Sequence, residues 1–161
     1  MHDDVKLSTS DVHILNICRK IEETCAQLYH YFARLHGDTP EAGALWEKTA
    51  QEEENHAEQF RLAYRLHGSG MESLNLDIRK ADALHGKILA AYEAVQQTPP
   101  PFKEALRFAI KLEQSMADYH MATVANFREK SLARLFTSMM KCDNQHIGML
   151  EQALKELEAA G

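Results

Sequence analysis

Two short runs, EEENHAE at residues 52–58 and CDNQHIG at residues 142–148, decide how this chain is expected to fold. Each run places an acid three residues before a histidine: Glu53 before His56, and Asp143 before His146. On a helix, side chains three residues apart share a face, so each pair can direct a carboxylate and an imidazole at one point. The two runs therefore predict two helices that present similar sets of ligand groups.

A single glutamate among apolar residues precedes each run, Glu22 before the first and Glu113 before the second. The separations are nearly equal, 31 residues (53 − 22) and 30 residues (143 − 113), which indicates two helix pairs of similar layout. Four carboxylates and two histidines that converge inside a helical bundle are the ligand set of a di-iron or di-manganese site. The predicted metal ligands are Glu22, Glu53, His56, Glu113, Asp143 and His146.

Helical register selects one acid from each cluster of acids. Glu22 shares its face with cysteines and a tyrosine, whereas Glu23 shares its face with charged residues. Glu53 lies on the apolar face of its helix, whereas Glu52 falls on the polar face. We therefore expect Glu22 and Glu53 to point inward, and Glu23 and Glu52 to point outward.

The predicted ligands must be weighed against an ordinary structural role. A lone glutamate can reach the surface, and a lone core histidine usually finds a structural hydrogen bond. Four buried carboxylates are different, because they would repel one another and no Lys or Arg lies in these stripes to neutralise them. Two cations would compensate that charge. His120, on the inner face two turns after Glu113, could either support the ligands or make a structural bond.

The three cysteines, Cys18, Cys25 and Cys142, fit neither a disulfide framework nor a zinc ribbon, because no CxxC is present. Cys18 and Cys25 lie one turn on either side of Glu22, and we interpret them as small core residues. Cys142 adjoins Asp143 but projects about 100° away from it on the helix. The predicted ligand set therefore contains no cysteine, and the roles of Cys18 and Cys25 stay open.

Composition indicates one all-α domain over residues 1–161. Four prolines and seven glycines interrupt a chain that is rich in helix-forming residues. Amphipathic patterns predict long helices at about 11–35, 41–66, 102–128 and from 131 onward, with a bundle core at about 12–158. The connection at about 70–101 carries its own helical pattern. A helix of about 20 residues spans roughly 30 Å, so it could cross the bundle and let the second and third long helices run parallel.

Charge and hydropathy exclude several classes of protein. A net charge of −6 without a basic stripe argues against nucleic-acid binding. No apolar run approaches the length of a membrane span, and the polar N-terminus has no signal-peptide core, so we expect a cytoplasmic protein.

These motifs resemble the ferritin-like superfamily, and within it the rubrerythrin-like di-iron carboxylate proteins. The resemblance covers about residues 12–158 and is carried by Glu22 with Tyr29, Tyr31, Phe32 and Ala33, by Glu53-x-x-His56-Ala57, by Glu113, and by Asp143-x-x-His146. It implies a four-helix bundle with a long helical crossover between the second and third long helices. It also implies two iron ions, with manganese as an alternative, and reduction of peroxide or O₂.

The chain departs from that family pattern in three ways. Asp143 stands where the pattern has a glutamate, so its reach is about 1.5 Å shorter. Met116 stands where rubrerythrins often have a further carboxylate. No Cys-x-x-Cys module flanks the bundle, so we expect no rubredoxin-like domain, and we expect electrons from a separate donor protein.

Two other functions stay open. A ferroxidase that stores iron would share this bundle, although such proteins usually have a fifth short helix after the fourth long helix. A helical protein that binds metal without catalysis, or that has lost its metal, would share the fold alone. In each case an exposed apolar strip on the crossover helix would suit a homodimer, which we expect.

Overall fold

The computed structural model describes residues 9–67, 78–124 and 130–161. Those ranges contain five α-helices and no strand, so the prediction of an all-α protein is confirmed. The helices are α1 (Thr9–Leu35), α2 (Pro40–His67), α3 (Ile78–Gln97), α4 (Phe102–Val124) and α5 (Lys130–Ala160). The end of the third predicted long helix, at residues 125–128, lies outside the described residues.

Proline marks two of the helix starts. Pro40 is the first residue of α2, where its missing N–H costs no hydrogen bond. The three prolines at residues 99–101 stand immediately before α4, and the first turn is closed by a 2.9 Å bond from Ala105 N–H to the Pro101 carbonyl. These signals account for the close agreement between the predicted and observed starts of both helices.

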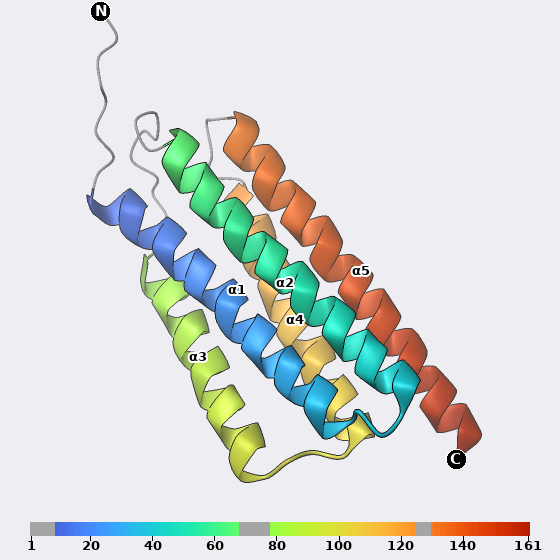
Figure 1. The fold of residues 1–161 in the computed structure, drawn as a ribbon. Coiled ribbons are helices and arrows are strands. Elements are labelled where there is room, and N and C mark those ends of the chain that lie inside the picture. Colours follow the sequence, from blue (N-terminus) through green and yellow to red (C-terminus); the bar gives the residue numbers. More distant parts are fainter. Residues whose placement is uncertain (1–8, 68–77, 125–129) are drawn as a thin grey trace, which may run out of the picture.

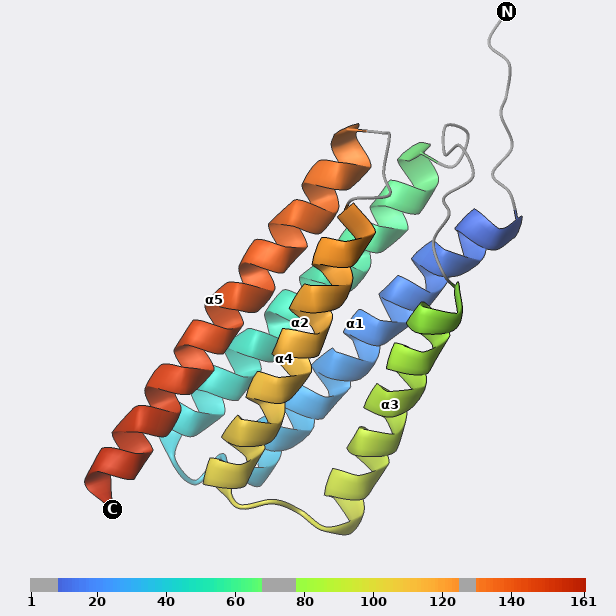
Figure 2. The same ribbon diagram turned by 180° about the vertical axis from the view of Figure 1, so that it is seen from behind.

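The five helices lie alongside one another in the arrangement that Figures 1 and 2 show. α1 packs along α2 and α4 along α5, while α2 also contacts α5 and α3 covers the outer side of α1. α2 and α4 run in the same direction, and α1, α3 and α5 run in the opposite one (Figure 1). One residue from each of α1, α2, α4 and α5 can therefore meet at one level between these helices.

Aromatic packing seals one end of the interior. Trp46 stacks on Tyr29 at 5.8 Å between ring centroids and lies 5.0 Å from Phe32. Phe60 and Phe136 form a second contact, at 5.2 Å, further along α2 and α5. The acidic residues of α2 and α5 fall between these two apolar groups along the helices, so apolar side chains exclude water on both sides.

The apolar face of α3 packs against α1. Ala81, Ile88 and Val95, at spacings of seven residues, are buried where α3 packs on α1. Leu89, beside them, is 42% exposed. The apolar stripe of the predicted crossover helix is therefore covered by α1 and does not form an exposed strip. Among the described residues, no helix combines the length and apolar character that crossing a membrane requires.

Candidate metal centre

Four carboxylates from four helices meet in the interior. Glu22 comes from α1, Glu53 from α2, Glu113 from α4 and Asp143 from α5, and each has an exposed fraction of 0%. Charged side chains are almost never buried this completely without compensating partners. Among the described residues, these carboxylates form ion pairs only with histidines.

The ligand atoms fall into two overlapping groups. Glu22, Glu53 and His56 form one, and Glu53, Glu113, Asp143 and His146 form the other, with the ligand atoms of each group within 4.8 Å of one another. Glu53 belongs to both, which is the position expected of a residue that bridges two ions. All six sequence-predicted residues are thus brought together, and the groups they form could hold a metal ion.

Both predicted histidine ligands turn the same ring nitrogen toward the acids. The Nδ1 atom of His56 lies 3.4 Å from Glu53 Oε2 and 3.6 Å from an oxygen of Glu22. Nδ1 of His146 lies 3.0 Å from Glu53 Oε1 and 3.3 Å from Glu113 Oε2. The two rings stack with their centroids 6.3 Å apart. Each imidazole therefore offers Nδ1 to the acids and leaves Nε2 on the opposite side of the ring.

Several of these buried polar atoms have no hydrogen-bond partner among the described residues. They are both carboxylate oxygens of Glu22 and of Glu53, Oδ1 of Asp143 and Nδ1 of His56. The oxygens of Glu22 and Glu53 lie near histidine nitrogens, but at distances and angles that make ion pairs without hydrogen bonds. Leaving ionised oxygens unsatisfied in an interior is costly, and a bound cation would satisfy them. The residues present therefore fit a metal ion.

Crowding of the acids changes their protonation. Burial, with the charge of a neighbouring glutamate added, raises the pKa of Glu53 and of Glu113 above the usual range. Burial also raises the pKa of Asp143. Burial opposes ionisation of Glu22 as well, but its interactions with Glu53, His120 and His56 lower its pKa to about 2. Repulsion between the two neighbouring carboxylates favours ionisation of one and protonation of the other, which accounts for the opposite shifts of their pKa values.

The two predicted histidine ligands hold protons in the absence of metal. Burial disfavours their charged form, but contacts with Cys142 and with the carboxylates raise the pKa of both His56 and His146. A metal ion can bind only to a deprotonated nitrogen, so metal binding must release these protons. Protons and cations are therefore alternative sources of positive charge for this cluster.

His120 contacts two of the predicted metal ligands, as a supporting residue would. It is 2% exposed, and its Nδ1 lies 2.6 Å from Asp143 Oδ2 while its Nε2 lies 3.4 Å from Glu22 Oε1. Burial opposes protonation, yet the hydrogen bond to Asp143 and the ion pair with Glu22 raise the pKa of His120 to about 10. Because one oxygen of Asp143 is occupied by His120, the other, Oδ1, is the one available to a metal ion.

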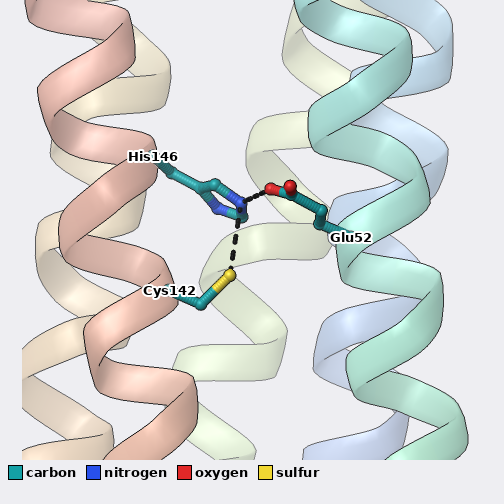
Figure 3. Close-up of side chains that lie close together, drawn as sticks. All are labelled: Glu52, Cys142 and His146. Atoms are coloured by element: carbon teal, nitrogen blue, oxygen red, sulfur yellow. Dashed lines mark hydrogen bonds and ion pairs between the residues drawn. The ribbon is translucent and has the colours of Figure 1, made fainter.

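Glu52 and Cys142 were not predicted to contact a metal ligand, but both contact the outer side of His146. Glu52 Oε2 forms a short contact with Nε2 of His146, and Cys142 Sγ lies 3.6 Å from the same nitrogen, as Figure 3 shows. A signal was available in the spacing, because Glu52 lies four residues before His56 and Cys142 four before His146. Both side chains sit at the edge of a helical face, where a neighbouring helix decides their direction.

The other residues around the acids are apolar or weakly polar. The Tyr29 hydroxyl donates a short hydrogen bond to Glu113 Oε1. Met116, where the family pattern often has a carboxylate, is fully buried with its sulfur 3.4 Å from Cys25 Sγ. Cys18 is buried and lies 3.5 Å from the Tyr119 hydroxyl. Cys18 and Cys25 are free thiols that fill the core, as the sequence predicted.

The ion pairs, the unsatisfied oxygens and the burial all describe one candidate metal centre between α1, α2, α4 and α5. Comparison of the chain with family models, with curated proteins and with solved structures found no match.

Proposed function

We propose that this protein is a di-iron carboxylate redox protein of the ferritin-like, rubrerythrin-like kind, with manganese as an alternative metal. In this proposal α1, α2, α4 and α5 form the four-helix bundle, and α3 is the crossover that lets α2 and α4 run parallel. The protein would reduce peroxide or O₂ with electrons from a separate donor protein. The observation that carries the proposal is a set of four fully buried carboxylates, three of which have oxygens without a hydrogen-bond partner. Their ion-pair partners, within the part of the chain that the structure describes, are histidines.

The ligand types favour iron or manganese. Each of the two groups offers one imidazole together with carboxylate oxygens. Such oxygen-rich ligation suits iron and manganese better than zinc, which more often takes sulfur and nitrogen in closed sites. Glu53 would bridge the ions, with Glu22 and His56 on one side and Glu113, Asp143 and His146 on the other.

A pair of adjacent iron ions would supply two electrons for cleavage of an O–O bond. The protein residues would hold the ions, exclude water and handle protons. Reduction of peroxide to water consumes protons, and His120 holds one between Asp143 and Glu22. Tyr29 holds another on its hydroxyl, which it donates to Glu113. The apolar groups around Trp46 and Phe60 would keep bulk water away from the ions.

The test is metal analysis of protein purified without oxygen, followed by stopped-flow mixing with peroxide and with O₂. We expect about two iron or manganese ions per chain and oxidation of the ferrous protein by peroxide faster than free Fe²⁺ is oxidised. A variant with Glu53→Gln and Glu113→Gln should lose both properties. Full metal content in that variant would contradict the proposed ligands, and a metal-loaded protein inert to both oxidants would contradict the redox role.

Molecular size separates this proposal from iron storage. We expect a homodimer of about 37 kDa (2 × 18.3) in solution. A closed shell of many chains that accumulates ferric mineral would instead establish the ferroxidase and storage function. Light scattering before and after aerobic iron loading distinguishes the two.

A further inference from the structure

One imidazole lies between two sets of ligand atoms. Nδ1 of His146 faces the inner carboxylates, at 3.0 Å from Glu53 and 3.3 Å from Glu113. Its Nε2 faces away from them, toward the Glu52 carboxylate and the Cys142 thiol (Figure 3). Of the two ring nitrogens, only Nδ1 faces the proposed ligands of the inner centre.

The outer three residues form a ligand group of their own. Glu52, Cys142 and His146 place an oxygen, a sulfur and a nitrogen within 4.8 Å of one another. The side chain of Glu52 is 32% exposed and Cys142 is half-buried, whereas the inner carboxylates are fully buried. The group therefore stands on the solvent side of the inner centre, on the seam between α2 and α5 that Figure 3 shows.

A thiolate, an imidazole and a carboxylate together suit borderline divalent ions such as Fe²⁺, Co²⁺ and Zn²⁺. Three protein ligands leave further positions for water, so an arriving hydrated ion need not lose its whole hydration shell at once. We propose that Glu52, Cys142 and His146 form an outer loading site, which captures one such ion and passes it to the inner group that shares His146. This inference rests on the proposed function, because the ion is passed to the proposed inner metal centre.

The handover follows from the chemistry of the shared ring. A neutral imidazole has one lone pair and one N–H. When Nε2 carries the lone pair it binds the outer ion, and Nδ1–H donates to Glu53 or Glu113. When Nδ1 carries the lone pair it binds the inner ion, and Nε2–H donates to Glu52. Occupation of the two sites is therefore alternative at His146, and the greater number of carboxylates inside draws the ion inward.

Cobalt(II) is the probe for this site, because thiolate ligation of Co²⁺ gives a near-ultraviolet charge-transfer band that oxygen and nitrogen ligands do not give. In stopped-flow mixing of the metal-free protein with Co²⁺, the band should appear early and decay as the inner site fills. Cys142→Ser should abolish the band and slow inner filling by about tenfold or more, without changing the final inner metal content. Glu52→Gln should also slow filling. Cys18→Ala is the matched control and should keep the band.

A second variant makes the outer site visible at equilibrium. Glu113→Gln with Asp143→Asn removes two inner carboxylates and leaves all three outer residues in place. This variant should hold one thiolate-bound Co²⁺ per chain with a stable charge-transfer band, in addition to any ion bound by Glu22, Glu53 and His56. Its helix content should match the natural protein by circular dichroism.

Absence of the band in both the natural protein and the equilibrium variant would overturn the outer site. A stable band in the variant with unchanged filling rates in Cys142→Ser would overturn the loading role. These results are separable from the proposed function: two inner ions without any thiolate band would refute only the outer site. A thiolate-bound ion with no inner metal would refute only the inner centre.

Discussion

The length of the Asp143 side chain determines how this residue can bind an ion in the group that contains His146. Its Oδ2 is bonded to His120 at 2.6 Å, which leaves Oδ1 for a metal ion. The ion beside His146 would therefore receive a single-oxygen contact from Asp143, whereas Glu53 can contact both ions.

We predict that the two ions bind unequally, with the Glu53–His56 side filled first. Asp143→Glu should tighten the second site, because the added methylene extends the carboxylate toward it. The cost is overpacking against Met139 and its neighbours, about 1–3 kcal/mol of the free energy of unfolding. Anaerobic Fe²⁺ titration should show two steps in the natural protein that merge in the variant. Two indistinguishable steps in both proteins would show that the backbone already compensates.

His120 makes stability depend on pH in the metal-free protein. Its pKa is raised from 6.5 to about 10, so the folded state holds a proton that the unfolded state loses. The stabilisation is complete below about pH 6.5 and is lost as the pH rises toward 10. Raised pKa values of Glu53, Glu113 and Asp143 act in the same direction.

We therefore predict that chelated protein becomes less stable as the pH rises through this window. The slope should be smaller in His120→Gln. His85→Gln should not make the slope smaller, because the pKa of His85 is lowered by burial and a lowered pKa contributes a slope of opposite sign. Urea unfolding at about pH 6, 7.5 and 9 measures how the free energy of unfolding changes with pH. With saturating Mn²⁺ the dependence should reverse, because metal binding releases protons. Equal slopes for natural protein and His120→Gln would contradict the role assigned to this histidine.

At the scale of elements, α3 matters because it covers α1, the helix that carries Glu22. Ile88 is 1% exposed at the α1–α3 contact, whereas its neighbour Leu89 is 42% exposed. Truncating Ile88 removes buried methyl groups and leaves a cavity, whereas truncating Leu89 mainly removes a side chain that already meets water.

We predict that Ile88→Ala lowers the free energy of unfolding by about 2–4 kcal/mol, and that Leu89→Ala changes it by less than about 0.5 kcal/mol. The two variants are matched in size and lie one position apart on the same helix. Chemical denaturation of both proteins in their metal-loaded form measures the difference. A larger loss in Leu89→Ala would indicate that Leu89 is buried between protomers, as a homodimer through α3 would require.

For the whole molecule, the metal centre joins α1, α2, α4 and α5, so cation binding should stabilise the entire fold. A ligand that binds only the folded state contributes about 4 kcal/mol when its free concentration is a thousand times Kd. Chelation should therefore lower the Tm of the natural protein. Glu53→Gln with Glu113→Gln should be insensitive to chelation, and more stable than the chelated natural protein because two like charges are gone.

Glu58→Ala is the control for this prediction, because Glu58 lies on the surface of α2 with a side-chain exposure of 61%. It should respond to chelation as the natural protein does. Scanning calorimetry with and without chelator provides the measurement. An unchanged Tm in the natural protein would show that the buried acids are compensated without metal.

The sequence by itself determined the helices and the inward faces. Periodicity separates Glu22 from Glu23, because a turn of helix sets the direction of a side chain at the centre of a buried face. The same local rule placed Glu53, Glu113 and Asp143 inside, and all are buried. These predictions needed no knowledge of the neighbouring helix.

Only the tertiary structure decided the roles of Glu52, Cys142 and His120. Glu52 and Cys142 lie at the margin of their helical faces, where the direction of the side chain depends on what the opposite helix presents. Glu52 turns toward α5 because His146 faces it across the seam between α2 and α5. His120 was predicted inside, but its partners come from α1 and α5, and their distances follow from packing. Helical period is a local property, whereas the pairing of atoms between helices depends on the fold as a whole.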